Sequence, residues 1–242
     1  MELLEAVLSR TSKRDFMDKP VPKELIVKIL SASLRAPSWA NSQPWEIAVS
    51  TGKTSEFIKN SLYELAKNNT PINPDYPFSI SRRLANANLS STPINSDYPV
   101  PNTWPEKQEA NMFETGKHRF EQLGIGREDA EKRREFALAN YKFFNSQTAI
   151  FIYLEESLGV WSILDCGMLI QNILLAVHDS GLGACPQAYL VAYPDILRQA
   201  FGLPANKKFI LGISIGYYKT DSKINDIKTF RNDFEDIVKF YD

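Results

Sequence analysis

Apolar and polar residues follow two different periods along this chain, and each period predicts one kind of element. Segments predicted as helices, mainly from apolar positions that recur every three or four residues, are 3–8, 21–30, 53–67, 106–141, 160–179 and 193–201. Short apolar runs rich in β-branched and aromatic residues predict strands at 45–49, 148–153 and 209–217. Because strands and helices alternate, we expect an α/β or α+β sandwich.

The helix predicted at 160–179 has apolar residues on most of its sides, among them Leu164, Met168 and Leu174. A helix of this kind is buried either in the core or in a subunit interface. The sequence Gly181-Leu182-Gly183 that follows predicts the end of the helix.

The segment 68–106 follows neither apolar period. It is rich in Asn, Ser and Pro and contains near copies of one motif at 70–77 and 92–99. Stacked repeat folds need about three units. We interpret the segment as a duplication in a long loop, either an ordinary surface insertion or a lid over a site. With 242 residues, 43% of them hydrophobic, the chain is predicted to form a single domain over 1–242 with a variable insertion at about 68–106.

Charge and composition narrow the classes of partner and of site. The formal net charge is -1, from 28 basic and 29 acidic residues spread along the chain, so we expect neither a nucleic-acid partner nor binding to an acidic membrane. The first residues lack the pattern of a secretory signal, so we expect a cytoplasmic protein with Cys166 and Cys185 reduced. The two histidines, His118 and His178, lie on different predicted helices, so no metal site is expected.

Two arginines and a serine share one short segment after the first predicted helix, at Arg10, Ser12 and Arg14. Arginine binds phosphate through forked, charge-assisted hydrogen bonds, and serine adds a donor. The segment therefore suits a phosphate, although a solvated charge cluster at a helix end has the same composition.

A second polar segment, at 36–45, reads Ala-Pro-Ser-Trp-Ala-Asn-Ser-Gln-Pro-Trp. Its hydroxyl and amide side chains lie between two prolines and next to a predicted strand, where they offer donors and acceptors to a polar ring or a sugar. An ordinary loop with capping residues has a similar composition.

Taken in this order, the two segments resemble the opening of the nitroreductase family of FMN enzymes. Later segments resemble the same family in the right order, at 140–144, at 181–187 and at Asn225-x-x-Lys228-x-x-Arg231. The similarity covers almost the whole chain apart from about 68–106.

The resemblance implies a nitroreductase-like α+β fold, with a central, mostly antiparallel sheet flanked by helices, in an intertwined homodimer that binds FMN at its interface. The residues to which it gives a role in FMN binding are Arg10, Ser12, Arg14, Ser38, Trp39, Asn41, Gln43, Asn140, Pro186, Gln187, Ala188, Lys228 and Arg231.

Within that set, Arg10, Ser12 and Arg231 would hold the phosphate. Lys228 stands where an arginine is expected, and it would add a point charge without the fork. The loop 38–43 would come from the other subunit, with Trp39 against the flavin, the substrate or only the interface.

The ring would be backed by the turn Pro186-Gln187-Ala188, where a backbone N–H faces the reactive nitrogen. Arg14, with Asn140 or Lys142, would reach the pyrimidine end. Reduction leaves negative charge at that end, and a cation there would stabilise it, so no catalytic side chain is expected.

The function implied is NAD(P)H-dependent reduction of nitroaromatic, quinone or similar acceptors by a ping-pong hydride transfer. One alternative is a flavin-dependent dehydrogenase or reductive dehalogenase of a specific metabolite. Another is a non-catalytic flavin-binding protein. The sequence does not distinguish NADH from NADPH as the donor.

Overall fold

A computed structural model of the chain describes residues 2–76 and 104–241. Most of the predicted insertion, including the second copy of its repeated motif, lies outside the described residues. The first copy is anchored to the body of the protein: the Asn73 N–H donates to the Ala192 carbonyl at 3.0 Å, the Tyr193 hydroxyl donates to the Thr70 carbonyl at 2.7 Å, and Ile72 is buried. Residues 70–73 are therefore held against the body of the protein, although they form no helix or strand.

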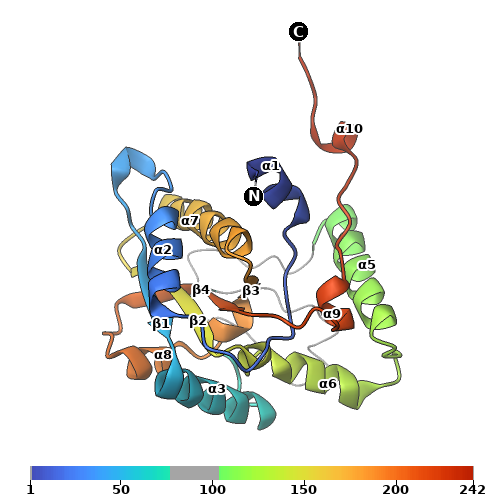
Figure 1. The fold of residues 1–242 in the computed structure, drawn as a ribbon, viewed down its shortest axis with the longest axis horizontal. Coiled ribbons are helices and arrows are strands. Elements are labelled where there is room, and N and C mark those ends of the chain that lie inside the picture. Colours follow the sequence, from blue (N-terminus) through green and yellow to red (C-terminus); the bar gives the residue numbers. More distant parts are fainter. Residues whose placement is uncertain (1, 77–103, 242) are drawn as a thin grey trace.

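Four strands form one sheet with the order β1-β2-β4-β3, and all three neighbouring pairs are antiparallel (Figure 1). Their bounds are β1 (Glu46–Ser50), β2 (Thr148–Glu155), β3 (Gly183–Gln187) and β4 (Lys207–Gly216). The three strands predicted from apolar runs are present, and the antiparallel sheet is confirmed.

Strand β3 was not predicted as a strand, and the description of Pro186-Gln187-Ala188 as a turn is wrong for its first two residues. Pro186 and Gln187 belong to β3, and the 3-10 helix η3 begins at Ala188. Proline has no N–H for a ladder, but β4 is the only strand of the sheet that pairs with β3, and edge strands tolerate proline.

Helices and short 3-10 turns make up the rest of the described chain. In order they are α1 (Leu3–Ser9), α2 (Lys23–Ser33), η1 (Trp39–Asn41), α3 (Gly52–Lys67), α5 (Glu106–Gln122), α6 (Ala130–Ala139), η2 (Phe143–Asn145), α7 (Val160–Asp179), η3 (Ala188–Val191), α8 (Pro194–Phe201), α9 (Lys223–Asp226) and α10 (Phe234–Ile237).

The single helix predicted over 106–141 is two helices, α5 and α6. Gly124 adopts a left-handed backbone with φ of 64°, a conformation that ends helices readily in glycine. The Asp129 carboxylate then accepts a hydrogen bond from the Gly126 N–H at 3.0 Å before α6 begins. In Figure 1 the two helices extend to one side of the sheet, with α9 next to α5.

The core lies on both faces of the sheet, and the alternation of side chains along β2 divides it. Ile150, Ile152 and Leu154 pack with residues of α2 and α7. Ala149, Phe151 and Tyr153 pack with residues of α3 and α8 on the opposite face. Since both faces are covered, β2 reads as a continuous apolar run in the sequence.

By length and composition, α7 is the one helix in the described part of the chain that could cross a membrane. It packs on α2 and β3, however, and its Asp165 is buried and accepts hydrogen bonds from the Trp39 N–H at 3.2 and 3.3 Å. Its opposite face leaves Trp161 and Leu164 exposed. The helix therefore has one face in the core and one apolar face uncovered within this chain.

Candidate active site

The segment that follows α1 lies in extended conformation along β3. Ser12 forms a bridge with Ala184, and the Lys13 N–H donates to the Ala184 carbonyl at 3.0 Å. Gly183 allows this close approach, because a Cβ there would stand 2.8 Å from Cγ of Lys13. The basic N-terminal motif is thereby held beside the strand that leads to Pro186.

Asn225 joins the N-terminal motif to the C-terminal motif. Its side chain is buried, and Oδ1 accepts hydrogen bonds from the N–H groups of Arg14 at 2.6 Å and Asp15 at 3.2 Å. Its Nδ2 donates to the carbonyls of Asp15 and Lys219, both at 2.8 Å. Asn225 opens the motif that contains Lys228 and Arg231, but no role was predicted for it from the sequence.

Four guanidinium groups form a series in which each repels the next, and we call them the guanidinium row: Arg231, Arg10, Arg14 and Arg119. Burial, and then repulsion from Arg231 and Arg14, lower the pKa of Arg10. Arg14 in turn repels Arg119. All except Arg231 also act on the buried thiol of Cys185, so the row passes along β3.

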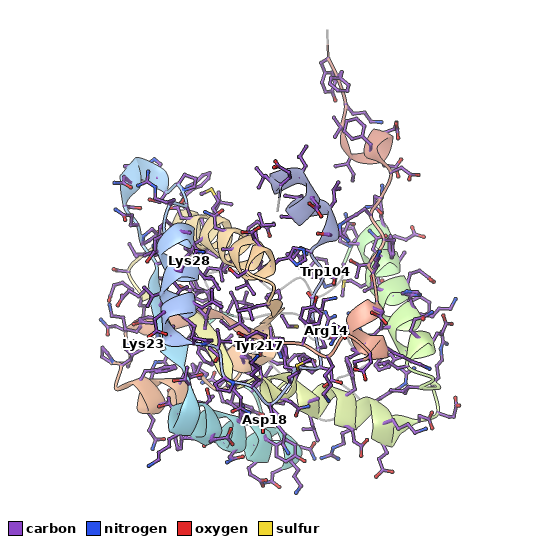
Figure 2. The ribbon with its side chains drawn as sticks, in the orientation of Figure 1. Arg14, Asp18, Lys23, Lys28, Trp104 and Tyr217 are labelled. Carbon is purple, nitrogen blue, oxygen red and sulfur yellow. The ribbon has the colours of Figure 1, made fainter. Side chains whose placement is uncertain are left out.

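No arginine of the guanidinium row is ion-paired with a carboxylate anywhere in 2–76 or 104–241. Figure 2 shows Arg14 in the middle of the molecule, beside α9. Guanidinium groups that are close together, partly buried and without counter-charge repel one another and lose solvation. An anion is the group that such an arrangement lacks.

Arg119 belongs to the row but was not predicted. Burial, followed by repulsion from Arg14, lowers its pKa to about 10. It comes from α5, whose many charges resemble a solvated helix face in the sequence. Only the fold, which brings α5 against the N-terminal motif, distinguishes Arg119 from the other charges of the helix.

The side chains of Gln187 and Asn140 are engaged with the protein itself. Nε2 of Gln187 donates to the carbonyl and to Oδ1 of Asn140, both at 3.2 Å, and its Oε1 accepts from the Ser214 hydroxyl at 2.5 Å. Nδ2 of Asn140 donates to the Ala137 carbonyl at 3.1 Å. The hydrogen bonds of these two predicted site residues therefore brace β3.

Pro186 and Ala188 keep partly exposed positions at the end of β3. Ala188 is the first residue of η3, and an N–H at the first position of a helix has no partner within that helix. The backbone part of the predicted ring segment therefore fits a ligand lying over the end of β3.

Lys142 does not join the guanidinium row. Its ammonium lies 3.8 Å from the centroid of the Tyr63 ring on α3. It lines a separate cavity of about 430 Å³ together with Lys59 and Lys219. That cavity also contains Asp18 and Glu56, so its charges are mixed.

The loop 38–43 is a strained and exposed turn. Ala40, Asn41 and Gln43 have φ angles of 49°, 55° and 46°, in the left-handed region that non-glycine residues rarely adopt. The Ser38 hydroxyl accepts a hydrogen bond from the Gln43 N–H at 3.0 Å and holds the turn closed. The Trp39 side chain is 76% exposed.

Comparison with known proteins assigns the chain to a family. Residues 7–217 match the nitroreductase family. The chain belongs to the nitroreductase family. A putative NADH dehydrogenase/NAD(P)H nitroreductase of Methanothermobacter thermautotrophicus is 45% identical over 226 residues, which are 90% of this chain and 78% of that protein. The resemblance inferred from the motifs is confirmed.

Other members of the nitroreductase family match over nearly the full length. The nitrobenzene nitroreductase of Ectopseudomonas oleovorans is 28% identical over 98% of this chain and 95% of its own. The crystal structure of the FMN-dependent nitroreductase NfnB from Mycobacterium smegmatis, in complex with NADPH, matches with a TM-score of 0.86 at 20% identity, over 99% of this chain and 97% of that chain. The predicted nitroreductase-like fold is confirmed.

Within one chain, this nitroreductase-family protein does not bring its two predicted binding segments together. Helix α7 separates them: η1 is attached at Asp165, whereas Ser9 at the end of α1 contacts His178 at 2.8 Å. Asp165 and His178 are thirteen residues apart, a distance of about 20 Å along a helix that rises 1.5 Å per residue. In Figure 1, η1 and α9 lie at opposite sides of the molecule.

The donor set of the guanidinium row suits FMN better than a metal. No cluster of three or more His, Cys, Asp or Glu side chains that could hold a metal occurs among the described residues. Arginines are phosphate ligands by charge and by shape. Arg119 also has a buried Nε with no hydrogen-bond partner, so the row includes an orphaned donor.

Proposed function

We propose that this protein is an FMN-dependent oxidoreductase that uses NAD(P)H to reduce nitroaromatic, quinone or similar acceptors. The observation that carries the proposal is the guanidinium row beside β3, which has no carboxylate partner in the described ranges. Bound FMN would supply the hydride chemistry, accepting a hydride from the nicotinamide and passing it to the acceptor. The chain itself would bind, orient and tune the cofactor.

Arg10, Ser12 and Arg231 form the phosphate end of this site, with Lys228 as an additional exposed charge. Arg231 is exposed, and its Nη1 is held by the Thr229 hydroxyl at 2.7 Å, which leaves its other nitrogens for a ligand. Lys13 has a different role, because its ammonium donates to the Asn225 carbonyl at 2.8 Å and ties the two basic motifs together.

Arg14 stands at the ring end. A fixed cation next to a flavin ring stabilises negative charge on the reduced ring without exchanging a proton. Pro186 and the Ala188 N–H cover the other side of the ring in this arrangement.

A second copy of the chain completes the site in our proposal, with its loop 38–43 over the flavin of the first. The separation of about 20 Å along α7 favours this, because one chain alone keeps the loop away from the row. Apolar side chains that are exposed within one chain supply a surface for dimerisation. They are Leu3, Leu4 and Leu8 of α1, Trp39, Trp161 and Leu164 of α7, and Phe234, Phe240 and Tyr241 of the tail.

Cys166 and Cys185 are both free and buried, in agreement with the predicted reduced pair. Their state suits a reducing compartment, and we propose a cytoplasmic location.

The decisive experiment is an absorption spectrum of the purified protein, recorded anaerobically before and after addition of NADH and then NADPH. We expect a flavin band that at least one donor bleaches. A colourless protein that takes up no added FMN contradicts the proposal. A flavoprotein that neither donor reduces is the result expected of a non-catalytic flavin-binding protein.

Two further measurements refine the assignment. Sedimentation velocity is expected to give a dimer, and a monomeric holoprotein would contradict the shared site. Turnover with a panel of nitroaromatic and quinone acceptors separates a broad reductase from a dehydrogenase or dehalogenase of one metabolite, which would reduce every generic acceptor poorly.

A further inference from the structure

Arg119 is the partly buried charged residue in the described part of the chain that has a buried nitrogen without a hydrogen-bond partner. The buried side-chain nitrogen and oxygen atoms without a partner there are Nε of Arg119 and the hydroxyl oxygen of Tyr141. A tyrosine hydroxyl is neutral, whereas a guanidinium carries a full charge that burial penalises strongly.

The protein gives Arg119 little compensation for that penalty. Its guanidinium carbon lies 5.9 Å from the centroid of the Phe136 ring, at the far limit of a cation–π contact. Arg14, a cation, is close enough to repel it, and no ion pair joins it to a carboxylate of 2–76 or 104–241. A charge in this position is unfavourable unless an anion comes to it.

The order of the guanidinium row indicates which anion that is. Arg231 and Arg10 neighbour each other at one end, where the two basic motifs meet. Arg119 neighbours Arg14 and Cys185 at the other end, and Cys185 immediately precedes Pro186 in β3. Arg119 therefore lies on the side of the flavin ring rather than of the phosphate.

We propose that Arg119 and Arg14 form a guanidinium pair that stabilises the negative charge of reduced FMN at the pyrimidine edge of its ring. The inference rests on the proposed function and extends it to a residue on α5. A hydride from NAD(P)H carries two electrons and one proton, so the ring gains one negative charge while NAD(P)+ leaves. Two guanidiniums at that edge favour the reduced form more than Arg14 alone.

The test compares Arg119→Met, Arg119→Lys and the control Arg127→Met with the wild-type flavoprotein. Methionine keeps an extended side chain without its charge, and lysine keeps the charge without the fork. Arg127 is exposed beside Phe113, so its replacement makes the same change in net charge away from the row. The readouts are thermal unfolding of the flavin-free protein, FMN affinity by fluorescence quenching, and the two-electron reduction potential.

For Arg119→Met we expect reduced FMN to bind about tenfold more weakly relative to oxidised FMN, which lowers the two-electron potential by about 30 mV. The flavin-free variant is expected to unfold at the same temperature as wild type or higher, because an unpaired buried charge has been removed. Arg119→Lys is expected to keep most of the wild-type potential, and Arg127→Met all of it.

An unchanged potential in Arg119→Met, or a flavin-free variant that is less stable or does not fold, would overturn the role of Arg119 and assign it to packing on Phe136. A potential lowered equally in Arg127→Met would also overturn it, since the effect would then be one of net charge. Wild-type protein that binds no FMN would instead refute the proposed function, so the two failures are distinguishable.

Discussion

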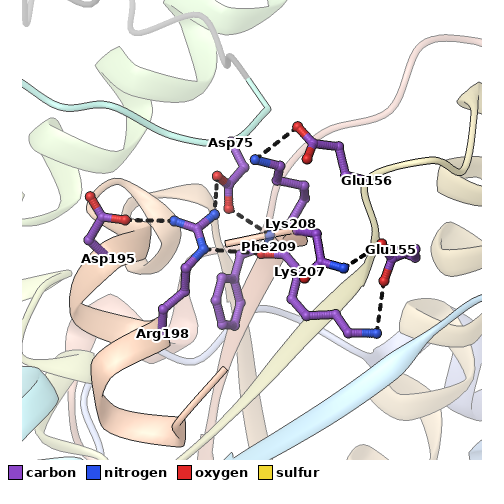
Figure 3. Close-up of polar contacts among 9 residues, drawn as sticks. Asp75, Glu155, Glu156, Asp195, Arg198, Lys207, Lys208 and Phe209 are labelled. Carbon is purple, nitrogen blue, oxygen red and sulfur yellow. Dashed lines mark hydrogen bonds and ion pairs between the residues drawn. The ribbon is translucent and has the colours of Figure 1, made fainter. Parts of the chain in front are cut away.

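Arg198 and the guanidinium row differ in whether carboxylates pair with their charges. Arg198 on α8 is almost buried, and its guanidinium is fully engaged: Nη2 pairs with Asp75, Nη1 with Asp195 at 2.8 Å, and Nε donates to the Lys207 carbonyl at 3.2 Å (Figure 3). The other oxygen of Asp75 accepts the Phe209 N–H at 2.9 Å. No carboxylate in the described part of the chain forms an ion pair with the guanidinium row beside β3.

The difference separates an arginine that is paired within the protein from arginines that we propose bind a ligand. A buried ion pair with every hydrogen bond made stabilises the local structure only while both partners are present. An unpaired cluster destabilises the protein until an anion binds, and the binding energy then includes the relief of repulsion. Disrupting the Arg198 site is thus expected to lower stability, whereas replacing an arginine of the row is expected to lower ligand affinity.

Removal of Asp75 should have the largest effect. Asp75→Ala leaves Nη2 of Arg198 and the Phe209 N–H without their partner, and we expect the free energy of unfolding to fall by about 3 kcal/mol. Chemical denaturation measures it. Glu156→Gln is the control, because the Glu156–Lys208 pair at 3.0 Å is exposed and should contribute less than about 1 kcal/mol. Equal effects at the two sites would contradict the distinction.

Arg10→Ala should show the opposite pattern. We expect the dissociation constant for FMN to rise about a hundredfold, since a charge-assisted phosphate contact is lost. The flavin-free protein should be no less stable than wild type, because burial and repulsion from Arg231 and Arg14 disfavour the lost charge. Fluorescence titration measures the FMN affinity and denaturation of the same samples measures the stability, with Arg127→Ala as the exposed control. A clearly destabilised flavin-free variant would show that Arg10, like Arg198, stabilises the fold.

Asn225→Ala is expected to lower both the stability of the protein and its affinity for FMN. The variant loses the hydrogen bonds that align the N-terminal motif, so we expect the protein to lose about 2 kcal/mol of stability and FMN to bind about tenfold more weakly. Asn225→Asp serves as the matched change, because it keeps the acceptor for the Arg14 N–H and loses the two donors. Unaltered FMN affinity in the alanine variant would show that the row does not depend on this brace.

The smallest effect concerns His178, whose Nε2 lies 2.8 Å from the Ser9 hydroxyl. Burial, and then the charges of Arg10 and Lys13, lower the pKa of His178 below its usual value. The unfolded chain therefore binds a proton more readily, so stability is lost as the pH falls below about 6.5, the pKa of an unperturbed histidine.

Thermal unfolding between pH 8 and pH 5 measures this loss, and His178→Gln should reduce it. Phosphate or FMN bound beside Arg10 should also reduce it in the wild type, because the anion offsets the repelling charges. An identical pH profile with and without the anion would argue against an anion site next to Arg10.

Much of the fold could be predicted because its signals are local. The runs at 148–153 and 209–217 became β2 and β4, and the apolar helix at 160–179 is α7 to the residue. Strand β3 was missed, since Gly-Ala-Cys-Pro-Gln has no run of β-branched or aromatic residues and is a strand only because β4 pairs with it. The break at Gly124 was missed because the charged pattern continues through it.

In the site, too, features that depend on neighbouring residues could be predicted, whereas features that depend on distant residues could not. Arg10, Ser12 and Arg14 could be proposed as one group because they stand close together in the sequence, and the structure brings Arg231 near Arg10. Gln187 and Asn140 are predicted to meet the flavin, and in the structure the Gln187 amide bonds to Asn140 and to the Ser214 hydroxyl. Which of several polar groups remains free depends on neighbours that are distant in the sequence.

The sequence by itself determined the family, the antiparallel α+β fold and the basic motifs, because periodicity and short motifs are properties of neighbouring residues. The tertiary structure alone decided which charges are paired. Arg198 and Arg119 are both arginines on helices, yet one meets Asp75 and the other meets Arg14. Burial and charge neighbours arise from contacts between remote segments, and these set the energy of each guanidinium.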